Sequence, residues 1–218
     1  MAMVKSSFPS IVLAFALCFT MSFGSYEYFK FVVQWPPTHC QVYPCNAQAL
    51  QSKIYTIHGL WPSNHSKAAV EYCIGSLFRY PAPPLDTRLK ISWPNLEARK
   101  TDAGFWAGEW HKHGKCSEQT LPQHDYFQRA HDIWVQHNIT DILQQAGIGS
   151  RTTKKYTEIE SPIFLKTQKI PLLRCKNTRK GQIPWLHEVV LCWDHDATYM
   201  TDCHRKETNC GNNDINIL

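Results

Sequence analysis

Thr-Ile-His-Gly-Leu-Trp-Pro at 56–62 and Phe-Trp-Ala-Gly-Glu-Trp-His-Lys-His-Gly-Lys-Cys at 105–116 are the segments from which the fold and the chemistry of this 218-residue chain are inferred. They contain four side chains that form a chemical set: His58, Glu109, Lys112 and His113. Cleavage of a phosphodiester without a metal ion requires a base, an acid and a cation. The two segments supply all three.

The second segment predicts a helix over 104–114. Residues three and four positions apart share one face of a helix. The residues with this spacing are Phe105, Glu109, Lys112 and His113. His111 points elsewhere, and His58 is expected at the end of a strand. Either histidine alone would more often be structural, and Glu109 with Lys112 alone would be a surface ion pair worth about 0.2–0.5 kcal/mol. The combination favours a site.

Both segments match the active-site signatures of the ribonuclease T2 family, Ile/Val-His-Gly-Leu-Trp-Pro and Phe-Trp-x-x-Glu-Trp-x-Lys-His-Gly-x-Cys. Segments 28–37, 61–64, 92–95, 171–175 and 186–192 closely resemble the S-ribonucleases of the rose family. The resemblance runs from about residue 26 to residue 210. It implies an endoribonuclease that acts on single-stranded RNA and needs neither a cofactor nor a metal.

The resemblance also implies a role for each residue of the set. His113 would take the proton from the ribose 2′-hydroxyl, and His58 would protonate the leaving 5′-oxygen. The product would be a 2′,3′-cyclic phosphate, and its hydrolysis, with the two roles exchanged, would leave a 3′-phosphate. Glu109 would raise the fraction of charged imidazole or hold a phosphate proton, and Lys112 would stabilise the phosphorane. DNA lacks the 2′-hydroxyl and would be inert.

Four further residues are predicted to bind bases. Trp61 and Phe105 are placed to stack on bases, and Gln34 and Asn95 resemble polar residues of the family's second base site. The remaining tryptophans are interpreted as core: Trp35, Trp93, Trp106, Trp110, Trp134, Trp185 and Trp193.

A metal site is the main rival interpretation. His111 and His113, or the Asp-His-Asp run at 194–196, offer ligand atoms. Side chains two positions apart on a helix diverge, and no HExxH motif or carboxylate cluster is present. We therefore predict no metal ligands.

Residues 1–24 have the layout of a secretory signal peptide, with Lys5, an apolar stretch over 11–19, and small residues Ser22 and Gly24. The alternative is a membrane anchor, but the apolar stretch is shorter than the roughly 20 residues that span a bilayer. We predict a secreted monomer without membrane attachment, in which residues 25–218 form one ribonuclease domain.

The nine cysteines fit an oxidising compartment, because removing the signal segment takes Cys18 and leaves an even number. Sequence alone does not choose the pairing. The family resemblance implies four disulfides: Cys40–Cys45, Cys73–Cys116, Cys175–Cys210 and Cys192–Cys203.

Two acceptor sequons begin at Asn64 and Asn138. In a secreted chain we favour glycosylation at either site, with Asn64 ahead because the family commonly carries a sugar just after its first signature. Removing Lys5 lowers the formal charge from +5 to +4. This mild basic bias would attract RNA but decides little alone.

The remaining pattern predicts secondary structure. Strands are expected over 26–35, 53–58, 186–193 and 197–203, and helices over 87–92, 104–114, 124–137, 140–145 and 157–167. This mixed order predicts a single α+β domain, with a central antiparallel sheet flanked by helices. In the helix over 124–137 the spacing predicts a core-facing stripe of Phe127, Ala130, His131 and Trp134.

Two biological roles fit these features. A stylar S-ribonuclease of gametophytic self-incompatibility, neutralised by pollen F-box proteins, fits the sequence pI of 8.7, the first sequon and the polar stretch 63–80. The alternative is a non-S ribonuclease of the same lineage in phosphate scavenging or defence, because 67–71 and 79–84 match no allele pattern. A third class, a binding or storage protein, would normally have lost one of the two histidines.

Overall fold

The structure is a computed structural model that describes residues 26–66, 70–176, 182–211 and 214–218. The predicted secretory segment, residues 1–24, lies outside the described residues. Within the described ranges, no helix is both long enough and apolar enough to cross a membrane.

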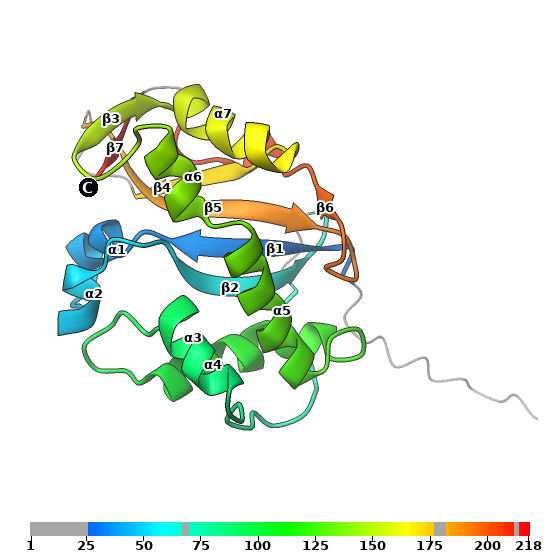
Figure 1. Cartoon of the computed structure of the whole chain (residues 1–218). Coiled ribbons are helices and arrows are strands. Elements are labelled where there is room, and N and C mark those ends of the chain that lie inside the picture. The colour runs from blue at the N-terminus through cyan, green and yellow to red at the C-terminus, as the bar shows by residue number, and fades with distance from the viewer. Residues whose placement is uncertain (1–25, 67–69, 177–181, 212–213) are drawn as a thin grey trace, which may run out of the picture.

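One mixed sheet forms the centre of the described chain (Figure 1). Its strands are β1 (Tyr28–Gln34), β2 (Thr56–Ser63), β3 (Thr152–Lys155), β4 (Leu172–Lys176), β5 (Trp185–Trp193), β6 (Met200–Thr201) and β7 (Asp214–Ile217). The strand order is β2-β1-β5-β7-β3, and β4 and β6 also pair with β5. The pairings of the described strands are antiparallel except that of β5 with β7. The predicted α+β fold is confirmed, and its antiparallel sheet contains one parallel pair.

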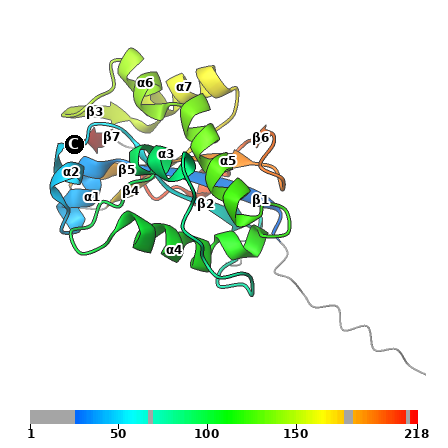
Figure 2. The same ribbon diagram turned by 60° about the horizontal axis from the view of Figure 1, so that its bottom comes forward.

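The longer helices pack against one face of this sheet through a shared set of buried apolar residues. On the β2 side lie α3 (Leu85–Ser92), α4 (Asp102–Lys112) and α5 (Gln123–Gln136), and on the β3 side lie α6 (Ile139–Gln145) and α7 (Tyr156–Thr167) (Figures 1 and 2). Two short helices, α1 (Pro36–Val42) and α2 (Ala47–Gln51), connect β1 to β2. Short 3₁₀ turns, η1 (Gly114–Ser117) and η2 (Arg205–Glu207), follow α4 and β6.

Strand β1 separates two apolar clusters. Phe29, Phe31 and Val33 belong to the large cluster, which they share with residues of α3 to α7. Tyr28 and Val32 belong to a smaller cluster. Successive side chains of a strand point to opposite faces, so the two clusters lie on opposite faces of the sheet. The polar residues of β1 alternate with the large-cluster residues and therefore share the face of the smaller cluster.

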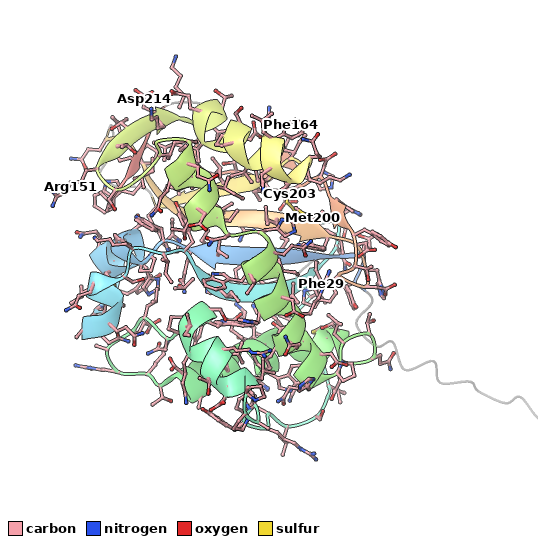
Figure 3. All side chains as sticks on the ribbon, viewed as in Figure 1. Phe29, Arg151, Phe164, Met200, Cys203 and Asp214 are labelled. Carbon is pink, nitrogen blue, oxygen red and sulfur yellow. A yellow bond between two sulfur atoms is a disulfide. The ribbon has the colours of Figure 1, made fainter. Side chains whose placement is uncertain are left out.

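The structure contains the four disulfides that the family resemblance implies: Cys40–Cys45, Cys73–Cys116, Cys175–Cys210 and Cys192–Cys203. The Cys73–Cys116 bridge joins η1, which follows α4 directly, to the loop after β2. The bridge therefore restrains the C-terminal end of α4. Figure 3 places Cys203 near Met200 at one end of the sheet, and Arg151 and Asp214 at the other.

Some predicted elements differ from the structure. β2 starts at Thr56 and continues to Ser63, so His58 lies inside the strand and not at its end. The helix predicted over 104–114 is α4, which already ends at Lys112. The elements that were not predicted are α1, α2, β3, β4 and β7, each no longer than seven residues.

The predicted stripe of α5 is partly wrong. The buried residues of α5 are Tyr126, Phe127, Ala130 and Ile133. His131 and Trp134 are only half-buried, because they lie at the margin of the buried face, where the indole N–H of Trp134 donates to the carbonyl of Tyr55. Trp185 is also half-buried, whereas Trp35, Trp93, Trp106, Trp110 and Trp193 are core residues as predicted.

Two glycines of the α4 region test this packing. A Cβ at Gly114 would lie 2.2 Å from the Trp110 ring, whereas a Cβ at Gly108 would meet no atom within 4 Å. We expect Gly114→Ala to lower the free energy of unfolding by about 1–3 kcal/mol, since the buried indole has little room to move. Gly108→Ala, inside α4, should raise it by about 0.5–1 kcal/mol. Denaturant unfolding measures both, and equal effects would contradict the packing.

Candidate active site

His58 is the extra residue of a β-bulge in β2. Val32 pairs with Gly59 and Val33 pairs with Ile57, which leaves His58 without a partner residue in β1. The fully buried Trp93 donates its indole N–H to the His58 carbonyl over 3.0 Å. Bulges redirect a side chain within a strand. The bulge and Trp93 therefore fix the direction of the imidazole.

The His58 imidazole is paired with a carboxylate of β5. Its Nδ1–H donates to Glu188 Oε1 over 2.6 Å, and the Glu188 side chain is 8% exposed. Burial lowers the pKa of His58, but the hydrogen bond and the negative charge of Glu188 outweigh burial and raise that pKa above 6.5. Burial raises the pKa of Glu188, but the bond and charge of His58 lower it to about 2. Both groups therefore favour their charged forms.

Glu109 of α4 meets β2 through Trp61. The carboxylate is buried, and its Oε2 accepts the Trp61 indole N–H over 2.9 Å. Burial raises the pKa of Glu109, and the charge of His58 and the Trp61 hydrogen bond offset that rise only in part. A Cβ at Gly59 would lie 2.0 Å from Trp61 Nε1 and 2.4 Å from Glu109 Oε2. The contact between β2 and α4 therefore requires glycine at this position.

His113 follows the last residue of α4 as its C-cap, with φ −121° and ψ −52°. It is not part of the helical face that the sequence predicts, but its ring stacks on Trp61 with centroids 5.1 Å apart. The residue is 6% exposed, and its Nδ1 has no hydrogen-bond partner among the described residues. Burial, with the positive charges of Lys112 and His58, lowers the pKa of His113 to about 3. Near neutral pH this imidazole is uncharged.

Lys112 and a cleft complete the site. Lys112 Nζ lies 3.3 Å from Glu71, and its side chain is 40% exposed. A cleft of about 540 Å³ opens beside Trp61 and His113. The charged residues of its wall are Lys30, Glu71, Arg174, Lys206 and Glu207. The cleft is large enough to admit a polar ligand next to His113.

Two of the predicted base-binding residues lie near this set. Gln34 ends β1 opposite Glu188, is 2% exposed, and its Oε1 accepts no hydrogen bond from any described residue. Phe105 of α4 is half-buried, with its ring centroid 6.2 Å from that of His58.

The side chain of Asn95 forms hydrogen bonds within its own loop, and its role in base binding stays a prediction. Its Nδ2 donates to the carbonyls of Glu97 and Lys100, and its Oδ1 accepts the Glu97 N–H. These bonds use the side-chain amide to close the loop between α3 and α4. The Asn95 side chain therefore stabilises the conformation of its own loop.

Sequence reasoning missed two residues, Glu188 and Arg174. Arg174 Nη1 lies 3.6 Å from Glu188 Oε2, and the guanidinium lies over the Trp61 ring at 5.6 Å from its centroid. The signal in the sequence was a charged residue inside an apolar strand, Glu188 within 185–193. The partner of Glu188, His58, could not be predicted, because the residues of one strand do not determine which residue of another strand lies beside them.

The two sequons lie in different settings. Asn64 lines the cleft. Asn138 is the N-cap of α6, and its Oδ1 accepts the Asp141 N–H over 3.2 Å. Glycosylation at either residue stays a prediction.

The residues of the rival metal interpretation lie apart, because His113 is buried in the site whereas His111 and His195 lie on the surface. His111 is exposed and contacts Tyr72 and Lys115. His195 is also exposed, and its Nδ1 lies 2.8 Å from the adjacent Asp196. In the part of the chain that the structure describes, no three His, Cys, Asp or Glu side chains are grouped as metal ligands.

The family model described as the ribonuclease T2 family matches residues 26–203, which contain the whole set. The chain belongs to the ribonuclease T2 family. It is accordingly a T2-type endoribonuclease.

This chain resembles known members of the family along most of its length. It is 33% identical over 194 residues to ribonuclease S-2 of Pyrus pyrifolia, covering 87% of this chain and 86% of that relative. It is 34% identical over 195 residues to ribonuclease MC of Momordica charantia, covering 87% and 100%. The crystal structure of an RNase MC1 mutant in complex with 5′-GMP superposes with a TM-score of 0.80 at 33% identity, covering 88% and 100%.

Trp61 offers a direct test of the site. Trp61→Phe keeps an aromatic ring beside His113 but removes the N–H that Glu109 accepts. We expect the free energy of unfolding to fall by about 1.5–3 kcal/mol, since a hydrogen bond to a buried carboxylate is lost. Denaturant unfolding measures the change. Trp185→Phe, at a half-buried tryptophan outside the site, is the matched control, and an equal loss there would contradict the role of the indole N–H.

Proposed function

We propose that this site cleaves single-stranded RNA by transphosphorylation between two histidines without a metal ion. The observation that carries the proposal is the contrast between the imidazoles. His58 is paired with a carboxylate at 2.6 Å, which favours its charged form. His113 is buried and uncharged. A general acid and a general base must differ in this way at one pH.

In the first step His113 is the base and His58 is the acid. The neutral His113 takes the proton of the ribose 2′-hydroxyl as the 2′-oxygen attacks phosphorus. His58 gives a proton to the 5′-oxygen as the bond from phosphorus to that oxygen breaks. The products are a 2′,3′-cyclic phosphate and a free 5′-hydroxyl.

In the second step the roles are exchanged. His58 takes a proton from water, the water oxygen attacks phosphorus, and His113 protonates the 2′-oxygen, leaving a 3′-phosphate. Lys112 lies beside His113 in sequence and stabilises the phosphorane. Its Nζ lies 3.3 Å from Glu71, so a phosphate oxygen competes with Glu71 for this ammonium group. Glu109, whose raised pKa suits it to hold a proton, assists at the phosphate.

The cleft suits a nucleotide next to the scissile phosphate. We propose that bases stack on Phe105 and on Trp61, which lines the cleft, and that a base bonds the Gln34 carbonyl oxygen, which has no partner among the described residues. The RNase MC1 mutant bound to 5′-GMP supports nucleotide binding by this fold. Asn95 acts through the loop that it closes and so supports the position of α4.

The two histidines give the decisive test. We expect His58→Ala and His113→Ala each to lower kcat on RNA by at least about 10²–10⁴-fold, since each loses a proton-transfer group. Hydrolysis of yeast RNA by the secreted or refolded protein, with and without EDTA, measures the loss. His111→Ala, two positions away and exposed, is the control that should keep wild-type activity.

Three results would contradict the mechanism: activity abolished by the chelator, full activity in either histidine variant, or cleavage of a substrate whose 2′-hydroxyl is replaced by hydrogen.

For the biological role we propose a secreted, monomeric stylar S-ribonuclease of self-incompatibility that pollen F-box proteins neutralise. The similarity to ribonuclease S-2 of Pyrus pyrifolia and the sequon at Asn64 support this role. The alternative is a non-S ribonuclease in phosphate scavenging or defence, supported by the equal similarity to ribonuclease MC.

Expression and inheritance separate the two roles. For the S-ribonuclease we expect transcripts confined to the style and inheritance of the sequence variants together with the pollen-rejection phenotype. Transcript measurement across tissues and a segregating cross provide the data. Transcripts in roots or leaves, with inheritance independent of rejection, would contradict the S role and favour the alternative.

A further inference from the structure

Glu188 occupies a costly position for a charge. It lies in the middle of β5, where the neighbouring side chains from Leu186 to Trp193 are buried and mostly apolar. The register places it between Gln34 of β1 and Arg174 of β4. A buried carboxylate is unfavourable unless other groups compensate its charge. The groups that compensate the charge of Glu188 therefore indicate its role.

The shortest of its polar contacts is with His58. Oε1 accepts the His58 Nδ1–H over 2.6 Å, whereas Arg174 Nη1 is 3.6 Å from Oε2. His187 Nδ1 is 3.6 Å from Oε1, but burial lowers the pKa of His187 to about 3, so this ring brings no positive charge near neutral pH. Of these three groups, only the His58 imidazole lies within hydrogen-bond distance of the Glu188 carboxylate.

We propose that Glu188 is a positioning residue for the acid of the reaction. It holds His58 through Nδ1 and keeps that imidazole protonated, so that Nε2 carries the proton delivered to the leaving 5′-oxygen. This inference rests on the proposed function and adds to it a residue outside the two sequence signatures.

The proton transfer balances with Glu188 as a spectator. As the bond between phosphorus and the 5′-oxygen breaks, that oxygen takes the proton of Nε2 and the imidazolium becomes neutral. Nδ1–H stays bound to the carboxylate. The neutral Nε2 then accepts the proton of the attacking water, and the charged pair is restored.

Besides Glu188, the titratable and charged groups that interact with His58 are His39 of α1, Glu109 of α4, His113 at the end of α4, Arg174 of β4 and His187 of β5. The charge of Arg174 opposes protonation of His58, and the charge of Glu109 favours it. Among these groups, only Glu188 also forms a hydrogen bond with the ring.

Glu188→Gln separates charge from orientation. The amide oxygen still accepts the Nδ1–H, but the negative charge is gone. We expect the alkaline limb of the pH profile of kcat/KM, which reports loss of the His58 proton, to move down by about 1 pH unit or more. The acid limb should stay in place, since it belongs to His113. Glu188→Asp keeps the charge and should restore much of the alkaline limb.

A buried glutamate outside the site provides the control. Glu160 of α7 is 6% exposed and pairs with Arg205. Glu160→Gln also removes a buried charge, so it reports any general loss of stability, and it should leave both limbs where they are in the wild-type protein.

An NMR titration of His58 in the absence of RNA tests the pairing of His58 with Glu188 independently of enzymatic activity. A lower His58 pKa in Glu188→Gln, with a shifted alkaline limb, supports the proposal. An unchanged His58 pKa and an unmoved limb in a folded variant would overturn it. A wild-type protein that does not cleave RNA would contradict the proposed function, and the titration would still decide the pairing.

Discussion

The contact of Trp61 with α4 is the interaction on which the site depends. One indole joins the edge strand β2 to a helix that begins about forty residues later, through an N–H bond to Glu109 and stacking on His113. The contact forms because Gly59 leaves no side chain between the indole and the carboxylate. The Cys73–Cys116 bridge restrains the C-terminal end of the helix, next to this contact. This contact therefore connects the strand that carries His58 with the helix end that carries His113.

The chemistry follows from the unequal surroundings of two identical side chains. His58 has a carboxylate bonded to its Nδ1, and His113 has only burial and positive neighbours. Burial alone makes an imidazole neutral, and a buried charge partner reverses the effect. The fold therefore assigns different protonation states, and the neighbour that favours the charged form of His58, Glu188, lies in neither active-site signature.

The sequence predicts those features that lie within one element. The spacing of Phe105 and Glu109 predicts their helix, and the aromatic alternation before Pro36 predicts β1. Pro36, which directly follows the strand predicted over 26–35, begins α1, since proline suits the first turn of a helix. The short strands β3, β4 and β7 carry too few residues for a period to be recognised.

Features that depend on pairing between elements are not visible in the sequence. The bulge at His58 exists only in the register of β2 against β1. The bond from His58 to Glu188 joins residues 130 positions apart. The loop role of Asn95 depends on carbonyls that the folded loop brings to it. The resemblance to a family supplied the disulfide pairs, which spacing alone did not determine.

The most direct test of the account is an NMR titration of both imidazoles in the free wild-type protein. We expect His113 to stay neutral until the pH falls to about 3, and His58 to keep its proton above pH 6.5, because its pKa is raised above the ordinary value. Two imidazoles that titrate together near 6.5, or a His113 that holds its proton longer than His58, would contradict the division into base and acid.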